Sequence, residues 1–217
     1  MPYRRTENVV RRLAAREEAI VAAARSIAAE DGLAAVQIAP VAARASIAAG
    51  TVYRYFPGKT DLVAEVVSDM AAATLESMKA AADAAPGPLS ALAAAMADFV
   101  RRGRAERSLM WAAIAEPVDA ALDALRLDFR RRLVDEFAHR IGRAMAGKHL
   151  PEQNARATAA AVLGALVEGA IGPLAPPHGE DAAARRAAVQ DAALLALRAV
   201  GVADARARGL VAQLALR

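Results

Sequence analysis

The stretch that most restricts how this chain can fold is residues 50–62, which reads Gly-Thr-Val-Tyr-Arg-Tyr-Phe-Pro-Gly-Lys-Thr-Asp-Leu. Hydroxyl groups and cations are interspersed there with apolar side chains, and Pro57-Gly58 is a pair that ends a helix. Such a stretch suits a short helix with two faces. Val52 and Phe56 can hold a small core, while the polar face can meet phosphate oxygens. This stretch points to DNA as a partner, which the longer remainder of the chain does not.

The composition predicts an all-α protein. Aromatic residues make up only 4% of the chain, and alanine supplies much of its 56% hydrophobic content. Alanine is the best helix former, and the aromatic residues that favour strands are scarce. The lack of cysteine excludes disulfides and thiolate metal sites and agrees with a reducing cytoplasm. The charged N-terminus has no apolar run before a cleavage site, so we expect no secretory signal and a cytoplasmic location.

The formal net charge of +4 is concentrated at one end of the chain. Residues 1–60 hold nine basic and five acidic residues, a difference of +4, which leaves 19 of each sign in residues 61–217. A cationic patch of this kind is expected of a protein that binds a polyanion. Four of the cations lie near the N-terminus, where they can form either an arm along DNA or a solvated tail: Arg4, Arg5, Arg11 and Arg12.

Periodicity and helix breakers divide the chain into two domains, residues 1–60 and 61–217. In the first, helices near 9–30, 38–45 and 48–56 give a helix-turn-helix plan, with Gly32 as a left-handed cap. Its expected shared core is Val41, Ile47, Val52 and Phe56. In the second domain we expect Thr60 to cap a helix that reaches residue 84. Further helices are expected near 89–103, 106–115, 118–147, 152–171, 180–200 and 204–215.

Residues 16–66 resemble the DNA-binding domain of the TetR/AcrR family of bacterial transcriptional regulators. The resemblance is carried by Val41-Ala42-Ala43-Arg44-Ala45, by Ile47, and by the whole of 50–62. It implies a homodimer whose recognition helices enter successive major-groove turns of a palindromic operator. It also implies a helical C-terminal domain that dimerises and binds a small-molecule effector, and a repressor that the effector releases from DNA.

The same resemblance assigns DNA contacts by position. Thr51 and Tyr53 would touch phosphates through their hydroxyls, and Lys59 would meet a phosphate at the start of the next helix. Arg54 would reach a phosphate or a guanine edge. Three further residues stand near the DNA backbone in this alignment: Gln37, Arg44 and Tyr55. The alternative for Tyr53 and Tyr55 is a ring packed in the small core with only its hydroxyl exposed, and for Arg44 a solvated surface position.

The chain departs from the family pattern at the turn and at the start of the recognition helix. Ser46 replaces the common glycine, so a left-handed backbone there would be strained. Ala48 replaces the usual hydroxyl cap, and Ala49 replaces a residue that is often polar. Ala48, Ala49 and Gly50 therefore form a small apolar edge. We hypothesise that Arg54, contacts to thymine methyl groups and DNA shape read the sequence.

In the larger domain, segments 158–175 and 180–200 resemble the family's two-helix contribution to a dimer interface. Its candidate interface or core residues are Leu163, Leu166, Val167, Leu194, Leu195 and Leu197. A membrane span over 158–175 is the less favoured interpretation because Glu168, three glycines and Pro173 interrupt it. Phe99, Trp111 and Phe129 are the candidate effector contacts, although each could equally be plain core. The basic runs 101–104 and 130–132 are interpreted as solvated faces with local ion pairs.

The sequence gives little support for catalysis, and we expect no enzyme activity, cofactor or metal. His139, His149 and His178 are scattered, and no phosphate-binding glycine loop or nucleophile elbow is present. Two alternatives to a repressor stay open. One is a helical small-molecule-binding protein or enzyme with a vestigial DNA-binding domain, and the other is a transcriptional activator.

Overall fold

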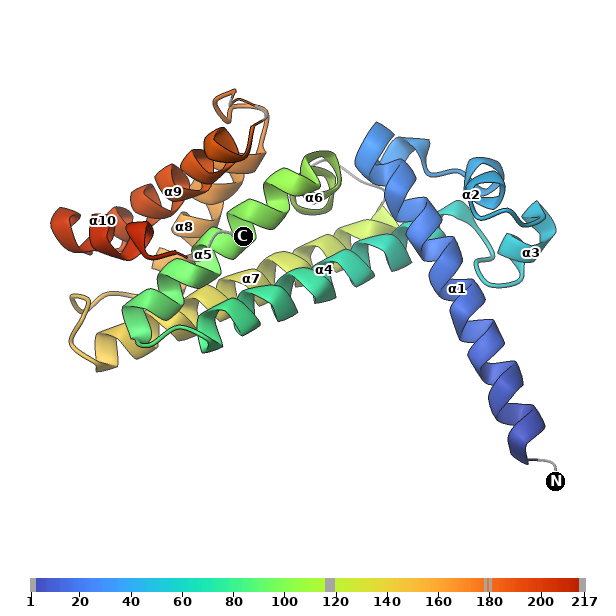
Figure 1. The fold of residues 1–217 in the computed structure, drawn as a ribbon, viewed down its shortest axis with the longest axis horizontal. Coiled ribbons are helices and arrows are strands. Elements are labelled where there is room, and N and C mark those ends of the chain that lie inside the picture. The colour runs from blue at the N-terminus through green and yellow to red at the C-terminus, as the bar shows by residue number, and fades with distance from the viewer. Residues whose placement is uncertain (1–2, 116–119, 178, 180, 215–217) are drawn as a thin grey trace.

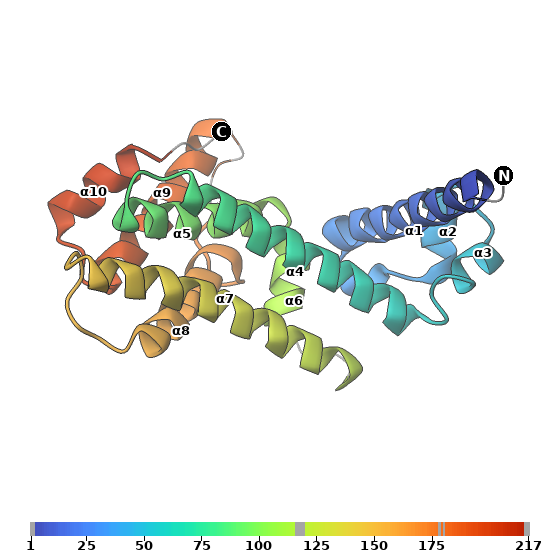
Figure 2. The ribbon, with the colours of Figure 1, turned by 90° about the horizontal axis from the view of Figure 1, so that it is seen from below.

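The computed structural model describes residues 3–115, 120–177, 179 and 181–214. These residues form helices and no strand, which confirms the predicted all-α class. A small N-terminal lobe is joined to a larger helical body, and α4 (Lys59–Asp83) runs from the lobe into the body (Figures 1 and 2). Among the described residues, none of the helices combines the length and the apolar character that crossing a membrane requires.

The N-terminal lobe has the predicted helix-turn-helix plan. It contains α1 (Tyr3–Asp31), the 3₁₀ turn η1 (Leu33–Ala35), α2 (Ile38–Arg44) and α3 (Ala49–Tyr53). Gly32 ends α1 with a φ of 82°, a left-handed conformation that glycine adopts without strain. Val41, Val52 and Phe56 are buried together with Ile20 and Ala24 of α1, whereas Ile47 is only partly buried at the edge of this core.

Two boundaries in this lobe differ from the sequence-based expectation. Helix α3 ends at Tyr53 and not near Phe56, because Phe56 precedes a proline and proline disfavours helical backbone in the residue before it. Helix α1 begins at Tyr3, so the expected basic arm is helical from its third residue. The side chains of Arg4 and Arg5 lie outside the described residues, while Arg11 and Arg12 are exposed on α1.

The body is built around α5 (Pro88–Ala105), which packs against α4, α7 (Ala120–Ala146) and α9 (Ala182–Ala199). Pro88 begins α5 directly after Pro86 and Gly87, and the Ser90 hydroxyl accepts a hydrogen bond from the Gly87 backbone N–H. Helix α4 begins at Lys59 with Gly58 as its N-cap, so the expectation that Thr60 caps it is wrong by two residues. The expected helix start at 118–119 lies outside the described residues.

The remaining helices complete the body on one side of α5 and α7. They are α6 (Arg107–Ile114), α8 (Ala155–Leu166), α9 and α10 (Asp204–Ala212). Asn154 and Asp181 cap α8 and α9 by accepting hydrogen bonds from the backbone N–H groups of Ala157 and Ala184, at 3.0 and 2.7 Å. These caps place the two helix starts two or three residues later than expected, because an Asn or Asp side chain satisfies the free N–H groups of a first turn.

Candidate DNA-binding surface and effector groove

The structure shows the predicted consequences of the two departures from the family pattern, at the turn and at the start of the recognition helix. Ser46 has a φ of 54°, so a non-glycine residue occupies the left-handed region there. Ala48 stands at the N-cap of α3 in extended backbone, with φ −71° and ψ 143°, and its side chain makes no capping hydrogen bond. Helix α3 is therefore held by its packing and not by its own termini, since a five-residue helix has little stability alone.

Helix α3, together with the residue that follows it, has one face buried in the core and one face exposed to solvent. Val52 is fully buried, whereas Tyr53 is 55% exposed and Arg54 is exposed. Thr51 is half-buried. Tyr55 is half-buried and packs against the core, so the alternative of a packed ring applies to Tyr55 and not to Tyr53. Ala48 and Gly50 are exposed and Ala49 is half-buried.

Lys59 and Gln37 lie on either side of a single backbone oxygen. The Lys59 ammonium and the Gln37 amide each donate to the Ala34 carbonyl at 3.1 Å. This shared acceptor brings the start of α4 next to the start of α2, although the two residues are far apart in the sequence. Both side chains stay exposed, so they add a cation and an amide to the polar surface of the lobe.

Arg44 and Arg54 differ in whether they already have a partner. Arg44 pairs with Glu30 at 2.6 Å and donates to the Ser26 hydroxyl at 2.8 Å. The hydrogen bond with Arg44 holds the pKa of Glu30 below its usual value, and the same bond raises the pKa of Arg44. Arg54 is exposed and makes no hydrogen bond or ion pair with any residue that the structure describes, so it is free to contact DNA.

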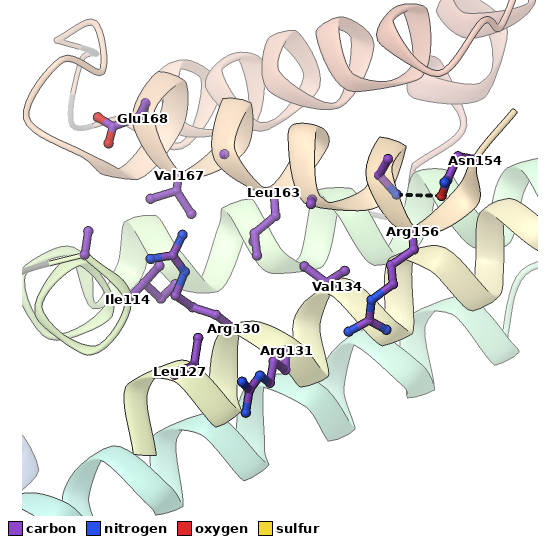
Figure 3. Close-up of a pocket in the computed structure, with 14 residues that line it drawn as sticks. Ile114, Leu127, Arg130, Arg131, Val134, Asn154, Arg156, Leu163, Val167 and Glu168 are labelled. Atoms are coloured by element: carbon purple, nitrogen blue, oxygen red, sulfur yellow. Dashed lines mark hydrogen bonds between the residues drawn. The ribbon is translucent and has the colours of Figure 1, made fainter. Parts of the chain in front are cut away.

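A groove lies between α6, α7 and α8 in the body (Figure 3). Its volume is about 840 Å³, within the usual range for small-molecule sites. The apolar lining comes from Ile114, Leu127, Val134, Leu163 and Val167. Three arginines, Arg130, Arg131 and Arg156, also line it, with Glu168 as the one acidic residue among the described lining residues.

The predicted effector residues do not line this groove. Phe99 and Phe129 are fully buried in the core, where the Phe99 ring meets Phe137 edge-on at 6.0 Å. Trp111 is half-buried and packs over Gly172, one helical turn before the groove residues Ile114 and Ala115. The role of all three as effector contacts stays a prediction. The signal that sequence reasoning missed was the basic run 130–132, which was interpreted as a solvated face although Leu127 and Val134 flank it at helical spacing.

The predicted dimer residues are placed mostly inside the protomer. Leu163, Leu166, Val167 and Leu197 are buried, and Leu194 is half-buried. They have little surface left to contribute to a partner. The exposed apolar surface of these two helices includes small residues on α8 and Leu195 on α9, which is 53% exposed. The small residues are Ala157, Ala160, Ala161, Gly164 and Ala165.

An ion-pair cluster joins the N-terminal lobe to the body. Arg25 of α1 donates to both carboxylate oxygens of Glu106 at 2.9–3.2 Å and to Asp69 of α4 at 2.8 Å. Glu106 is the residue between α5 and α6. We call Arg25, Asp69 and Glu106 the interlobe clamp.

Arginines next to the clamp hold the end of α8. Helix α8 continues into the π-helical turn η2 (Val167–Ile171). Arg104 donates to the Ala170 carbonyl at 3.0 Å, and Arg107 donates to the carbonyls of Ile171 and Gly172 at 2.7 and 2.5 Å. Burial lowers the pKa of Arg104, and the charge of Arg107 lowers it further. The groove wall, η2, α6 and α1 are therefore linked by side-chain hydrogen bonds.

Comparison with known families identifies the N-terminal lobe. Residues 20–66 match the model of the family described as bacterial regulatory proteins, tetR family. The chain carries the DNA-binding domain of the TetR family. The match spans the last part of α1, η1, α2, α3 and the start of α4, and it includes Thr51, Tyr53, Arg54 and Lys59. No curated protein matches the chain significantly.

Solved structures of similar fold cover nearly the whole chain. RolR in complex with resorcinol is 20% identical with a TM-score of 0.64, and the match covers 94% of this chain and 96% of that one. A tetR-family regulatory protein from Rhodococcus is 22% identical with a TM-score of 0.69, over 87% and 98% of the two chains. FadR from Bacillus subtilis in complex with stearoyl-CoA is 18% identical with a TM-score of 0.62, over 71% and 84%. At these identities the likeness establishes the fold and nothing beyond it.

Proposed function

We propose that this TetR-family protein is a DNA-binding transcriptional repressor, a homodimer that a small-molecule effector releases from a palindromic operator. The observation that carries the proposal is the division of α3 into two faces. Val52 and Phe56 anchor the segment in the core, while Tyr53 and Arg54 are exposed beside it. A short helix fixed from behind with hydroxyl and cationic groups in front suits the major groove of DNA.

Each exposed group has a role in this proposal. The hydroxyls of Thr51 and Tyr53 and the ammonium of Lys59 bind phosphates and set the position of the helix on DNA. Arg54, which has no partner among the described residues, reads a guanine edge, where a bidentate contact discriminates by about 1–3 kcal/mol. The small edge at Ala48 and Ala49 lets the helix approach the groove floor and touch thymine methyl groups.

The proposed dimer brings two such helices to one operator. TetR-type recognition requires the two helices to lie about 34–36 Å apart, or a multiple of that, so that both enter the same face of the duplex. We place the dimer surface on α8 and α9. Its members would be Ala161 and Ala165 of α8, which do not line the groove, together with Leu194 and Leu195, because small residues allow helices to approach closely.

The proposed effector site is the groove between α6, α7 and α8. Resorcinol and stearoyl-CoA are bound by two proteins of the same fold, which supports a small-molecule ligand for the body of this chain. Helix α6 ends at the groove and begins at the interlobe clamp. A ligand that shifts α6 would therefore favour a different position of α1, and hence of α3. This is a population shift between a DNA-binding and a released conformation.

DNA binding can be tested with labelled fragments from the region upstream of the protein's own gene, by fluorescence anisotropy. Binding should fall steeply as salt rises, because each phosphate contact releases counterions. Arg54→Ala should weaken binding to the preferred fragment about 5–100-fold and to random DNA much less. Tyr53→Phe, which removes one hydroxyl, should weaken both.

Lys79→Gln is the matched control, because Lys79 is exposed on α4 in the part of the helix that lies within the body. It should leave DNA binding unchanged. The absence of binding to every fragment at low salt would refute the proposal. An activator is distinguished by deleting the gene, since target transcripts rise without a repressor and fall without an activator.

A further inference from the structure

We propose that the groove between α7 and α8 selects an amphipathic organic anion, with its charged group on Arg130 and its apolar part on the helix side chains. This inference names the ligand class of the effector site and so rests on the proposed function. It rests separately on the chemistry of the lining, which combines a continuous apolar wall with cations that lack carboxylate partners (Figure 3).

The apolar wall is contributed by three helices. Leu127 and Val134 lie on α7, Leu163 lies on α8, Val167 lies at the start of η2, and Ile114 closes one end from α6. Leu127 is 44% exposed, which is unusual for a leucine and leaves apolar surface facing the opening. An inorganic ion would leave this surface in water, whereas an organic body would cover it at about 25 cal/mol per Å² of buried apolar area.

The charges within the groove are unbalanced. Arg156 pairs with Asp135 across α7 and α8, and Arg132, the next residue in the basic run, lies within reach of Asp128. Arg130 and Arg131 make no hydrogen bond or ion pair with any described residue. Arg130 extends toward Ile114 and Val167 in the gap between the helices (Figure 3). Of the three arginines that line the groove, Arg130 and Arg131 therefore have no carboxylate partner among the described residues, whereas Arg156 has Asp135.

This combination disfavours a neutral apolar ligand. Such a ligand would cover Arg130 and remove water from it without supplying a counter-charge, which is costly for a guanidinium. A carboxylate or sulfonate on the same body pairs with the guanidinium through charge-assisted hydrogen bonds, often two at once. Selectivity for the anion over its neutral analogue should therefore depend on Arg130, while the apolar contacts serve both ligands.

The test compares two fluorescent probes that share one apolar body. 8-Anilinonaphthalene-1-sulfonate carries a sulfonate, and N-phenyl-1-naphthylamine lacks it. Energy transfer from Trp111, the only tryptophan, reports binding near α6 and excludes distant surface sites. We expect the sulfonate probe to bind at least 10-fold more tightly than the neutral one. Arg130→Gln should remove this difference and leave binding of the neutral probe unchanged.

Two further variants complete the design. Arg143→Gln is the matched control, since Arg143 is exposed on the same helix and does not line the groove, and it should change neither probe. Leu127→Gln should weaken both probes, and the exposure of Leu127 makes it a mild change for folding. Equal affinity for the two probes, or an Arg130→Gln variant that keeps the preference, overturns the proposal. Weaker probe binding at protein concentrations where the dimer forms also overturns the proposal, because the partner protomer then fills the groove.

DNA binding separates this inference from the proposed function. If the sulfonate probe binds through Arg130 and the protein never binds DNA, the groove assignment stands and the proposed function fails. If another compound releases DNA from wild type and from Arg130→Gln equally while the two probes bind alike, the function stands and the groove assignment fails.

Discussion

The interlobe clamp should contribute measurably to stability, and Arg25→Gln, Glu106→Gln and the double variant test this. Arg25 and Glu106 are joined by three donor–acceptor contacts of 2.9–3.2 Å, with side-chain exposures of 23% and 31%. Exposed ion pairs are worth about 0.2–1 kcal/mol, and charge-assisted hydrogen bonds about 1.5–3 kcal/mol. Because this pair is partly solvated yet bidentate, we expect a coupling energy of about 1–2 kcal/mol.

The assay is urea unfolding of the four proteins in one double-mutant cycle. Arg25→Gln also breaks the pair with Asp69 at 2.8 Å, but the cycle cancels that loss because it occurs with and without Glu106. Arg208→Gln serves as the control, since Arg208 pairs with Asp204 at 63% and 55% exposure on α10. Its effect should stay below about 0.5 kcal/mol. A coupling energy under about 0.3 kcal/mol between Arg25 and Glu106 would refute the reasoning, because the contact would then be a solvated pair with no role in joining the lobes.

Three other substitutions have expected outcomes. Ala48→Ser supplies the missing cap of α3 and should raise the free energy of unfolding by about 0.5–1 kcal/mol in urea; no gain would show that the extended Ala48 backbone is unsuited to capping. Gly103→Ala places a Cβ 2.3 Å from Cδ1 and 2.8 Å from Cγ1 of Ile171, so it should destabilise by about 1–3 kcal/mol, and Ile171→Val should recover part of the loss. Arg44→Gln should make stability less sensitive to acid: the pKa of Glu30 is lowered in the folded state, so its contribution is present above the unfolded pKa and is lost as pH falls. Urea denaturation at a series of pH values measures this. The same loss of stability at acid pH in the variant and in wild type would contradict it.

The DNA-binding lobe was largely predictable because its signals are local. The Gly32 cap, the Pro57-Gly58 stop and the apolar spacing of Val41 and Val52 each act within a few residues. The strain at Ser46 and the missing cap at Ala48 were also predictable. The family pattern has glycine at the first position because the backbone there is left-handed, and a hydroxyl residue at the second because it caps the helix. The boundary errors at Thr60 and Phe56 arise where a neighbouring glycine or proline decides which residue begins or ends the helix.

The body was less predictable because its features depend on contacts between distant segments. The leucines of segments 158–175 and 180–200 identify faces that are buried. Their spacing does not indicate whether they are buried within the same protomer or against a second one. Leu163 and Leu197 are buried within the protomer. In the same way, the run 130–132 is a basic stretch on its helix, and it becomes part of a groove only because α8 packs beside α7.

The side-chain hydrogen bonds that link the groove wall, η2, α6 and α1 limit how far a bound ligand can change the affinity for DNA. A ligand in the groove contacts Leu163 of α8 and Val167 at the start of η2. Arg104 and Arg107, at the α5–α6 junction, donate to the carbonyls of Ala170, Ile171 and Gly172 at 2.5–3.0 Å. The same junction holds α1 through Glu106. A ligand shifts the equilibrium only by its difference in affinity for the two conformations, and a two-state change from 1:99 to 99:1 needs about 5.5 kcal/mol. If the clamp supplies about 1–2 kcal/mol of coupling, it can carry only part of such a shift. The remainder must then pass through α4, which runs from the lobe into the body and packs there on α5 and α7, and through the packing of α1 on α4 and α6.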